Sequence, residues 1–167
     1  AANTLTITGT SGITIGGTNT TAETITSTST GAVTLTSNNT NATSITTGAG
    51  ADAITLTGGS AVVETISTGA GNDTVTFTAN LANADVLDGG DGTDTLAGTN
   101  ANIGGLDVLT GNANISNFET VRLADALNGD ITLANVQAGI TSLRLDDGAT
   151  GAEAATFETG SKSIDLR

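Results

Sequence analysis

Short runs in which apolar and polar residues alternate recur along the chain with a period of about 21 residues. Three well-matched units each begin with an isolated apolar residue among polar neighbours, and these residues, Ile45, Ile66 and Leu87, are evenly spaced. Each unit continues through a glycine-containing segment and ends in a second alternating run: AITLT, TVTFT or DTLAG. Because side chains on a strand alternate between its two faces, such runs predict strands with one buried face. Each unit is therefore expected to be a short strand, a turn, a second strand and a return loop.

The same outline flanks these three units on both sides. Before them lie NTLTITGTSGITIGG and ETITSTSTGAVTLTS, and after them, at similar spacing, lie TVRLADA, TSLRLDD and KSIDLR. A period of about 20 residues with two strands per unit is typical of a β-solenoid. We therefore predict an all-β, right-handed parallel solenoid of about eight coils at ~4.8 Å strand spacing. No helix is firmly predicted, although GDITLANVQAG is compatible with a short one.

We divide this expected stack into three parts. Residues 1–46 form threonine-rich coils without a metal motif, residues 47–97 form the coils with the glycine–aspartate turns, and residues 98–167 form degenerate coils and a cap.

The composition fits a repetitive fold better than an ordinary globule. The 167 residues include three Phe but no Trp, Tyr, Met, Pro, Cys or His. So few large side chains would not offset the chain entropy of a compact globule, whereas small side chains stacked in rows can. The absence of Cys and His removes disulfides, zinc ribbons and the usual catalytic triads. No apolar run is long enough to predict a membrane-spanning helix. The first residues, AANTLTITG, lack a basic n-region, and their strand-like pattern suggests a fragment of a longer protein.

Charge is distributed unevenly along the chain. The net charge of −13 disfavours nucleic acids and anionic membranes as partners. Residues 52–94 carry seven acidic residues and no basic one. The four basic residues all lie in the last third, at Arg122, Arg144, Lys162 and Arg167. An acidic segment without compensation favours cations as partners.

Three glycine-rich turns place an aspartate at the same point of successive units. The segments TGAGAD, TGAGND and GGDGTD end in Asp52, Asp73 and Asp94, which are separated by the same constant interval as the strands. Stacking would bring these carboxylates into one column, where they repel one another unless a cation lies between them. Glycines allow positive φ and let carbonyls turn inward, and six to eight oxygens suit Ca²⁺ better than Mg²⁺. Three stacked turns would thus enclose two layers and two Ca²⁺ sites.

These turns resemble the calcium-binding repeat of the RTX (repeats-in-toxin) family, G-G-x-G-x-D-x-U-x, where U is a large apolar residue. Residues 89–97 match every position, whereas residues 47–55 and 68–76 have Thr in place of the first Gly. The resemblance implies carbonyl ligands from the first four positions of each turn and an aspartate shared between layers. The implied metal ligands are Thr47, Gly48, Ala49, Gly50, Asp52, Thr68, Gly69, Ala70, Gly71, Asp73, Gly89, Gly90, Asp91, Gly92 and Asp94.

The pattern departs from the RTX family in one respect. Each repeat unit contains one nonapeptide, whereas an RTX coil contains two, so ions are expected along one edge only. A weaker match to the motif, GGLDVL at Gly104–Leu109, is a further candidate turn, although the spacing between its glycines and its aspartate differs from that of the motif.

The turns have other interpretations. Three Asx-type turns in a metal-free solenoid form the simplest alternative. An EF-hand is excluded because no D-x-D-x-D-G loop ends in Glu at the twelfth position. A dinucleotide fingerprint is excluded because the third Gly is missing and a strand follows instead of a helix.

Function is predicted mainly from a second, looser resemblance. The segment ISNFETVRLAD (Ile115–Asp125) resembles a strand that follows RTX blocks in bacterial surface-layer proteins and large secreted adhesins. The simpler interpretation, which we favour, makes Phe118 a core or capping residue and Glu119 a solvated charge. The resemblance implies a secreted, extracellular structural protein, exported by type I secretion, that binds Ca²⁺ and self-associates into a lattice or filament. A cell-surface polysaccharide remains open as a further partner, through parts of a longer protein outside this sequence.

Two functions of other classes are alternatives to this one. An adhesin or ice-binding module would use outward threonine rows, but the row through Thr55 and Thr76 is broken by Ala97. A hydrolase would use carboxylate pairs such as Asp146–Asp147 or Asp88–Asp91, but neither histidine nor an aromatic platform supports them. We therefore expect a protein that is not an enzyme.

Overall fold

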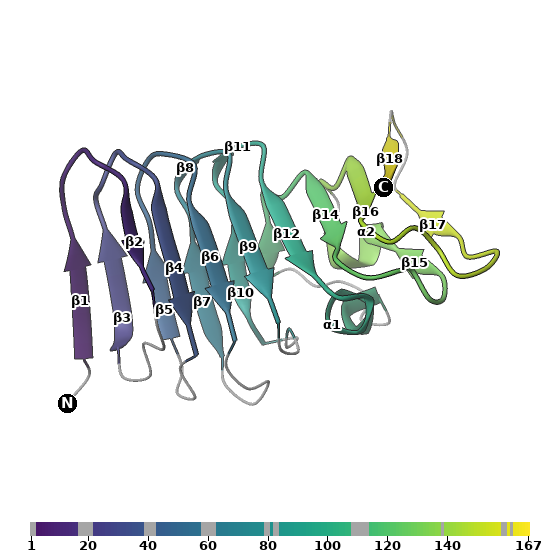
Figure 1. Cartoon of the computed structure of the whole chain (residues 1–167), viewed down its shortest axis with the longest axis horizontal. Helices are drawn as coiled ribbons and strands as arrows, with labels where there is room; N and C mark the ends of the chain where they lie inside the picture. The colour runs from purple at the N-terminus through teal and green to yellow at the C-terminus, as the bar shows by residue number, and fades with distance from the viewer. Residues whose placement is uncertain are drawn as a thin grey trace.

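The chain winds into a stack of coils between two parallel sheets (Figure 1). The computed structural model describes residues 3–16, 22–38, 43–57, 63–78, 81, 84–107, 114–137, 139–157, 160 and 162–167. The six-stranded sheet contains, in spatial order, β1 (Asn3–Ile7), β3 (Ala22–Ser27), β5 (Thr43–Thr46), β7 (Glu64–Ser67), β10 (Val86–Asp88) and β13 (Ile115–Ser116). The eight-stranded sheet contains β2 (Ile13–Ile15), β4 (Val33–Ser37), β6 (Ala53–Leu56), β9 (Thr74–Phe77), β12 (Thr95–Gly98), β14 (Thr120–Leu123), β16 (Ser142–Leu145) and β18 (Ser163–Leu166). The predicted parallel β-solenoid is confirmed.

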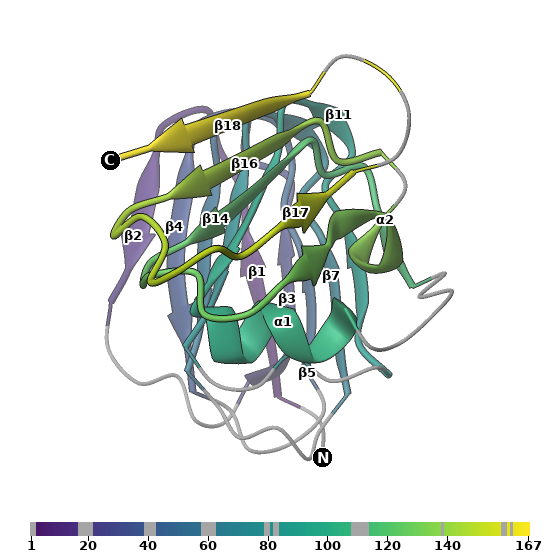
Figure 2. The same ribbon diagram turned by 90° about the vertical axis from the view of Figure 1, so that its right-hand side faces the viewer.

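The coils are not all alike. In the described part of the chain, six coils contribute a strand to both sheets, whereas β16 and β18 extend only the eight-stranded sheet. The expectation of about eight full coils therefore holds for the eight-stranded sheet and is wrong for the six-stranded sheet. Beside β16 and β18 the chain instead forms β15 (Ile131–Thr132) and β17 (Ala155–Thr156), which pair with each other, and the short α2 (Leu133–Val136) (Figure 2). The segment GDITLANVQAG does contain this short helix.

The core consists mainly of aliphatic columns that run along the stack. In the six-stranded sheet the register aligns Leu5, Ile25, Ile45, Ile66, Leu87 and Ile115. In the eight-stranded sheet it aligns Ile15, Leu35, Ile54, Val75, Leu96, Val121, Leu143 and Ile164. Away from the ends of the stack these side chains are buried in one cluster. Each buried side chain of this kind contributes about 1.5–3 kcal/mol, so a narrow interior can be stable with only three Phe in the chain.

One helix was not expected from the sequence. Residues Asn100–Asp107 form α1, which begins where the Thr99 hydroxyl accepts the backbone N–H of Asn102 at 3.2 Å. The Asn102 side chain donates to the carbonyl of Phe77 at 3.2 Å and so ties the helix to the preceding coil. Gly104 and Gly105 therefore lie in a helix rather than in a turn of the stack, and the expectation of a further glycine turn here is wrong. The rest of that segment, Val108–Leu109, lies outside the described residues.

The turns from the first sheet to the second lie along one edge of the solenoid, the top edge in Figure 1. Two of them also pair with each other through the short strands β8 (Ala70–Gly71) and β11 (Asp91–Gly92). Gly90 has φ +85°, and a Cβ on it would collide with the carbonyl oxygen of Gly69 in the preceding coil. Glycine is therefore required here both for conformation and for the close approach of two backbones.

Substitution of two glycines should separate these two requirements. Gly129 also has positive φ (+103°), but a Cβ on it would meet no atom within 4 Å. We expect Gly90→Ala to lower the free energy of unfolding by about 1–3 kcal/mol more than Gly129→Ala does, because only Gly90 faces another backbone. Urea unfolding followed by circular dichroism measures both. Equal losses would contradict the close stacking of the turns.

Candidate metal centre

The three aspartates of the glycine turns form a buried column at the start of β6, β9 and β12. Each directly precedes its strand, and the pairing of Ala53 with Thr74 and of Thr74 with Thr95 places them in register. Their exposed fractions are 2% for Asp52, 1% for Asp73 and 0% for Asp94. The stacking predicted from the regular spacing of the aspartates is thus present, and the carboxylates lie inside the turn edge.

One oxygen of each carboxylate joins successive coils. The Oδ1 atoms of Asp52, Asp73 and Asp94 accept the backbone N–H groups of Val33, Asp52 and Asp73 respectively, each at 2.7 Å. Each acceptor lies one coil further along the stack than its donor. Hydrogen bonds to an ionised acceptor are short and about twice as strong as neutral ones. The column therefore links the coils as well as carrying charge.

A fourth carboxylate continues the column. Glu119 Oε2 accepts the backbone N–H of Asp94, also at 2.7 Å. The interpretation of Glu119 as a solvated charge is therefore wrong, whereas Phe118 is fully buried, as expected of a core residue. Sequence reasoning missed Glu119 because it follows Asp94 at a longer interval than the one that separates the three aspartates. Helix α1 falls within this longer coil.

The second oxygen of each aspartate has no partner. The Oδ2 atoms of Asp52, Asp73 and Asp94 are buried and make no hydrogen bond. Burial raises the pKa of Asp73, although the N–H of Asp52 and the Thr68 hydroxyl oppose the rise. Burial likewise raises the pKa of Asp94 to about 6, and the nearby charges of Asp73, Glu119 and Asp88 add to the effect.

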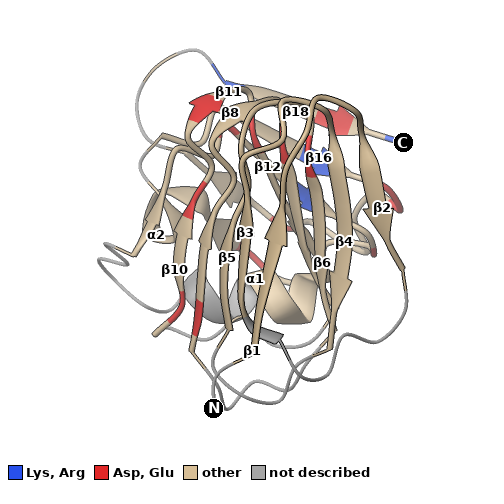
Figure 3. Cartoon of the chain, turned by 90° about the vertical axis from the view of Figure 1, so that its left-hand side faces the viewer, with Lys and Arg blue, Asp and Glu red and all other residues tan. Residues whose placement is uncertain are grey.

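The basic residues do not neutralise the column. Arg122 and Arg144 both bind Asp146 at 2.7 Å, Arg167 binds Asp165 at 3.0 Å, and Lys162 donates to a backbone carbonyl. Figure 3 shows basic residues by β16, at the C-terminus and, in that view, above β11. A charged column without a counter-ion is costly, so it requires protons or added cations.

The remaining residues of the expected ligand set share this edge, but many of their carbonyls already join coils. The carbonyls of Gly48 and Gly69 accept backbone N–H groups of the next coil at 2.9 and 2.8 Å, and the carbonyl of Ala70 accepts that of Gly50 at 2.9 Å. The carbonyls of Thr68 and Gly89 accept the hydroxyls of Thr47 and Thr68, at 2.9 and 2.8 Å. These two threonines stand where the RTX repeat has its first Gly, and this hydroxyl ladder gives them a structural role. Asp91 and Gly92 are exposed.

The donor set fits a hard cation in part. All of its atoms are oxygens, three carboxylate oxygens lack a partner, and each carbonyl has a second lone pair. Among the described residues, no three acidic side chains lie close enough to bind one ion together. A Ca²⁺ site here would therefore need the carbonyls as well as the aspartates, and the fifteen ligands remain a prediction.

A second buried carboxyl pair lies at the opposite edge, where the return loops enter the first sheet. Glu64 at the start of β7 is 7% exposed, and Asp85 just before β10 is 0% exposed. Asp85 Oδ1 accepts the backbone N–H of Glu64 at 3.0 Å. Burial raises the pKa of Glu64 to about 8, and the side-chain hydrogen bond with Asp85 and the negative charge of Asp85 add to the rise. Sequence reasoning missed the pair, since neither residue belongs to a repeated motif.

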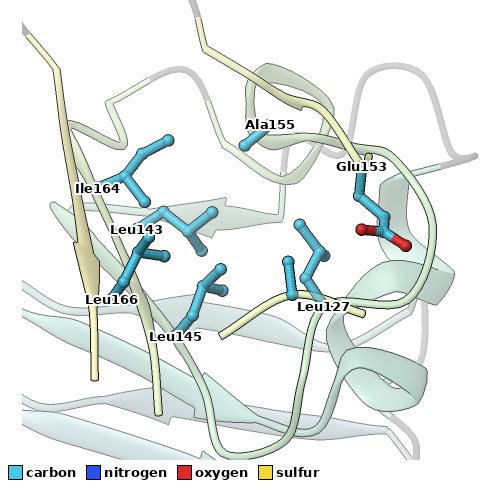
Figure 4. Close-up of a pocket in the computed structure, with 8 residues that line it drawn as sticks. Leu127, Leu143, Leu145, Glu153, Ala155, Ile164 and Leu166 are labelled. Atoms are coloured by element: carbon cyan, nitrogen blue, oxygen red, sulfur yellow. The ribbon is translucent and has the colours of Figure 1, made fainter. Parts of the chain in front are cut away.

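A pocket at the C-terminal end of the stack is mainly apolar, and its lining includes none of the residues of the aspartate column. It encloses about 200 Å³ between the last strands of the second sheet and β17. Its lining residues are Leu127, Leu143, Leu145, Ala149, Glu153, Ala155, Ile164 and Leu166 (Figure 4). Ile164 and Leu166 are 51% and 66% exposed because no further coil of the described chain covers them.

Comparisons of the chain with protein-family models, curated proteins and solved structures found no match. The resemblance to the RTX family therefore depends on the residues of the three turns. Within the described residues, no helix has the length and apolarity needed to cross a membrane.

The Glu64–Asp85 pair predicts that stability falls as pH rises. An unfolded Glu titrates near its ordinary value of 4.5, whereas folded Glu64 holds its proton up to about pH 8. Its contribution is therefore fully present below pH 4.5 and is lost progressively up to pH 8, by at most about 1.4 kcal/mol per pH unit. Glu64→Gln imitates the protonated side chain, so we expect a smaller loss of stability between pH 5 and pH 8. Urea unfolding at several pH values, without divalent cations, measures it.

Glu153→Gln provides the matched control, because Glu153 lies in the C-terminal segment near the pocket. This variant should keep the pH dependence of the original chain. The same dependence of stability on pH in Glu64→Gln and in the original chain would show that folded Glu64 does not hold its proton above its ordinary pKa.

Proposed function

We propose that the chain is a calcium-dependent structural protein, part of a lattice or filament on the outside of a bacterial cell. The observation that carries this proposal is the column of buried aspartates, each with an unpartnered oxygen and without an ion pair to a basic residue in the described part of the chain. A divalent cation would cancel charge that the chain itself leaves uncompensated. Secretion, and its type I route, come from the RTX resemblance.

Calcium is the preferred cation for chemical reasons. The column offers carboxylate and carbonyl oxygens on a backbone of adaptable glycine turns, and Ca²⁺ accepts six to eight such ligands in irregular geometry. The residues that would hold it are Asp52, Asp73 and Asp94 through Oδ2, with carbonyls of the turns using their second lone pairs. Bound Ca²⁺ supplies positive charge between coils.

The solenoid itself supports a structural role. Each coil contacts mainly its neighbours, and length is added by repetition rather than by enlarging a core, as in other repeat proteins. The pocket at the C-terminal end of the stack is apolar, with Glu153 as the one charged residue of its lining. Such a rod can carry load and present long, regular faces to other copies.

Removal of calcium should weaken the fold. Excess EDTA at pH 7.5 should lower the melting temperature, because buried carboxylates then lose their counter-ion, and added Ca²⁺ should restore it better than Mg²⁺ does. Asp73→Asn keeps an oxygen for the N–H of Asp52 but removes the charge shared by two layers. We expect Asp73→Asn to bind fewer Ca²⁺ ions per chain than Asp52→Asn does, and calorimetric titration measures both numbers. A melting temperature indifferent to EDTA and Ca²⁺ would overturn the calcium proposal.

Assembly can be tested by electron microscopy of the purified chain with and without millimolar Ca²⁺. Sheets or filaments that form only with Ca²⁺ are expected for a lattice subunit. Dispersed particles under both conditions would contradict the structural proposal and favour the second candidate.

That second candidate, an adhesin or ice-binding module, is favoured by the outer face of the six-stranded sheet. Its register aligns two hydroxyl rows, Thr4, Thr24, Ser44 and Thr65 beside Thr6, Thr26, Thr46 and Ser67. These rows continue over four coils, whereas the row through Thr55 and Thr76 ends at Ala97. A regular array of hydroxyl and methyl groups could order water or hold a sugar. This second candidate would be supported if the dispersed chain inhibits ice recrystallisation and the Thr26→Lys variant does not.

A further inference from the structure

The acidic column does not end with the glycine turns. Thr95 pairs with Thr120, so the residue before each strand, Asp94 in one coil and Glu119 in the next, occupies the same position. Glu119 accepts the N–H of Asp94 at 2.7 Å, the distance at which Asp94 accepts that of Asp73. By position and by hydrogen bond, Glu119 is the fourth member of the column.

The oxygen that would face a ligand in this last layer belongs to Asp94. Asp94 is fully buried, and its Oδ2 atom has no hydrogen-bond partner. Both this oxygen and the carbonyl oxygen of Asn117 lie so close to Gly89 that a Cβ on this residue would collide with them. A carboxylate, a backbone carbonyl and the carboxylate of Glu119 therefore come together around one turn.

Negative charge accumulates here without compensation. Asp88 adds a further carboxylate, held by the Asn117 side chain at 2.7 Å and by the backbone N–H of Gly90 at 3.1 Å. Both Asp88 and Glu119 act electrostatically on Asp94. Arg122, the basic residue closest in sequence, is bound to Asp146 instead.

We propose that Asp94 and Glu119 form a further cation site, which extends the column of Ca²⁺ ions by one layer beyond the glycine turns. The proposal rests on the calcium-dependent function above. Glu119 and Asp88 are half-buried whereas the three aspartates are buried, so this end of the column is also where a hydrated ion can reach it.

Glu119→Gln is the sharpest test, because the amide oxygen of Gln can still accept the N–H of Asp94 while the charge is removed. Glu153→Gln makes the same chemical change away from the column and serves as the control. Calorimetric titration with Ca²⁺ at pH 7.5 should show one ion fewer per chain for Glu119→Gln and no loss for Glu153→Gln.

A second measurement applies if Glu119→Gln folds poorly without calcium and cannot be titrated. The slope of melting temperature against the logarithm of Ca²⁺ concentration reports the ions taken up on folding, and it should be shallower for Glu119→Gln than for the control. If Glu119→Gln binds as many ions as the original chain while Asp73→Asn binds fewer, Glu119 is not part of a cation site, and the calcium function still stands. If Glu119→Gln and Glu153→Gln lose the same number of Ca²⁺ ions, the loss is a general effect of net charge, and the site at Glu119 is contradicted as well. Absence of Ca²⁺ binding by the unsubstituted chain would overturn the calcium function and this site together.

Discussion

Parallel stacking in register places each residue of a coil beside its equivalent in the next coil, and the rest of this structure depends on that constraint. For aliphatic residues the constraint is favourable, because Ile45, Ile66 and Leu87 bury one another. For hydroxyls it is also favourable, since Thr47 and Thr68 each donate to the following coil. For carboxylates it is unfavourable, because like charges at about 4.8 Å repel in a medium of low dielectric. The aspartate column is thus the position at which stacking needs something from outside the chain: a proton or a cation.

The sequence was sufficient to predict the regular part of the fold. Alternation indicated the strands, their constant interval indicated the stacking, and the absence of large aromatics indicated a narrow core. These inferences worked because a solenoid coil is specified locally, and its long-range contacts repeat the same local pattern. The column at Asp52, Asp73 and Asp94 was predictable for the same reason. Its chemistry was less so, because periodicity does not reveal that Oδ1 would bind a backbone N–H while Oδ2 would remain without a partner.

What the sequence did not predict lies where the period breaks. Helix α1 lengthens one coil, and this hides the equivalence of Glu119 and Asp94, which only the register of β12 with β14 shows. The Glu64–Asp85 pair was missed for a related reason. The two residues are separated by one regular period, but one is Glu and the other Asp, and variable return loops surround them. Carboxylates that meet once, rather than in every coil, give no repeat to detect.

The same position of the stack is filled in two ways along the chain, and the difference has a physical consequence. The register aligns Ile13, Val33 and Asp52 at this position. Ile13 is 40% exposed and Val33 is fully buried, and neither apolar side chain requires a counter-ion, whereas acidic residues occupy the position from Asp52 to Glu119. The polar turn before Val33 is satisfied by hydroxyls instead, since Ser29 accepts the N–H of Gly31 and donates to the carbonyl of Ser11. The N-terminal coils are therefore stable regardless of pH or cations at this position, and the middle coils are not. Val33 joins the two parts, because its N–H is bound by the first aspartate. Neutralisation of the column, by protons or by the proposed cations, would stabilise only the acidic coils. A change in pH or in cation concentration would then act on the middle coils and leave the N-terminal coils, with their hydroxyl rows, in place.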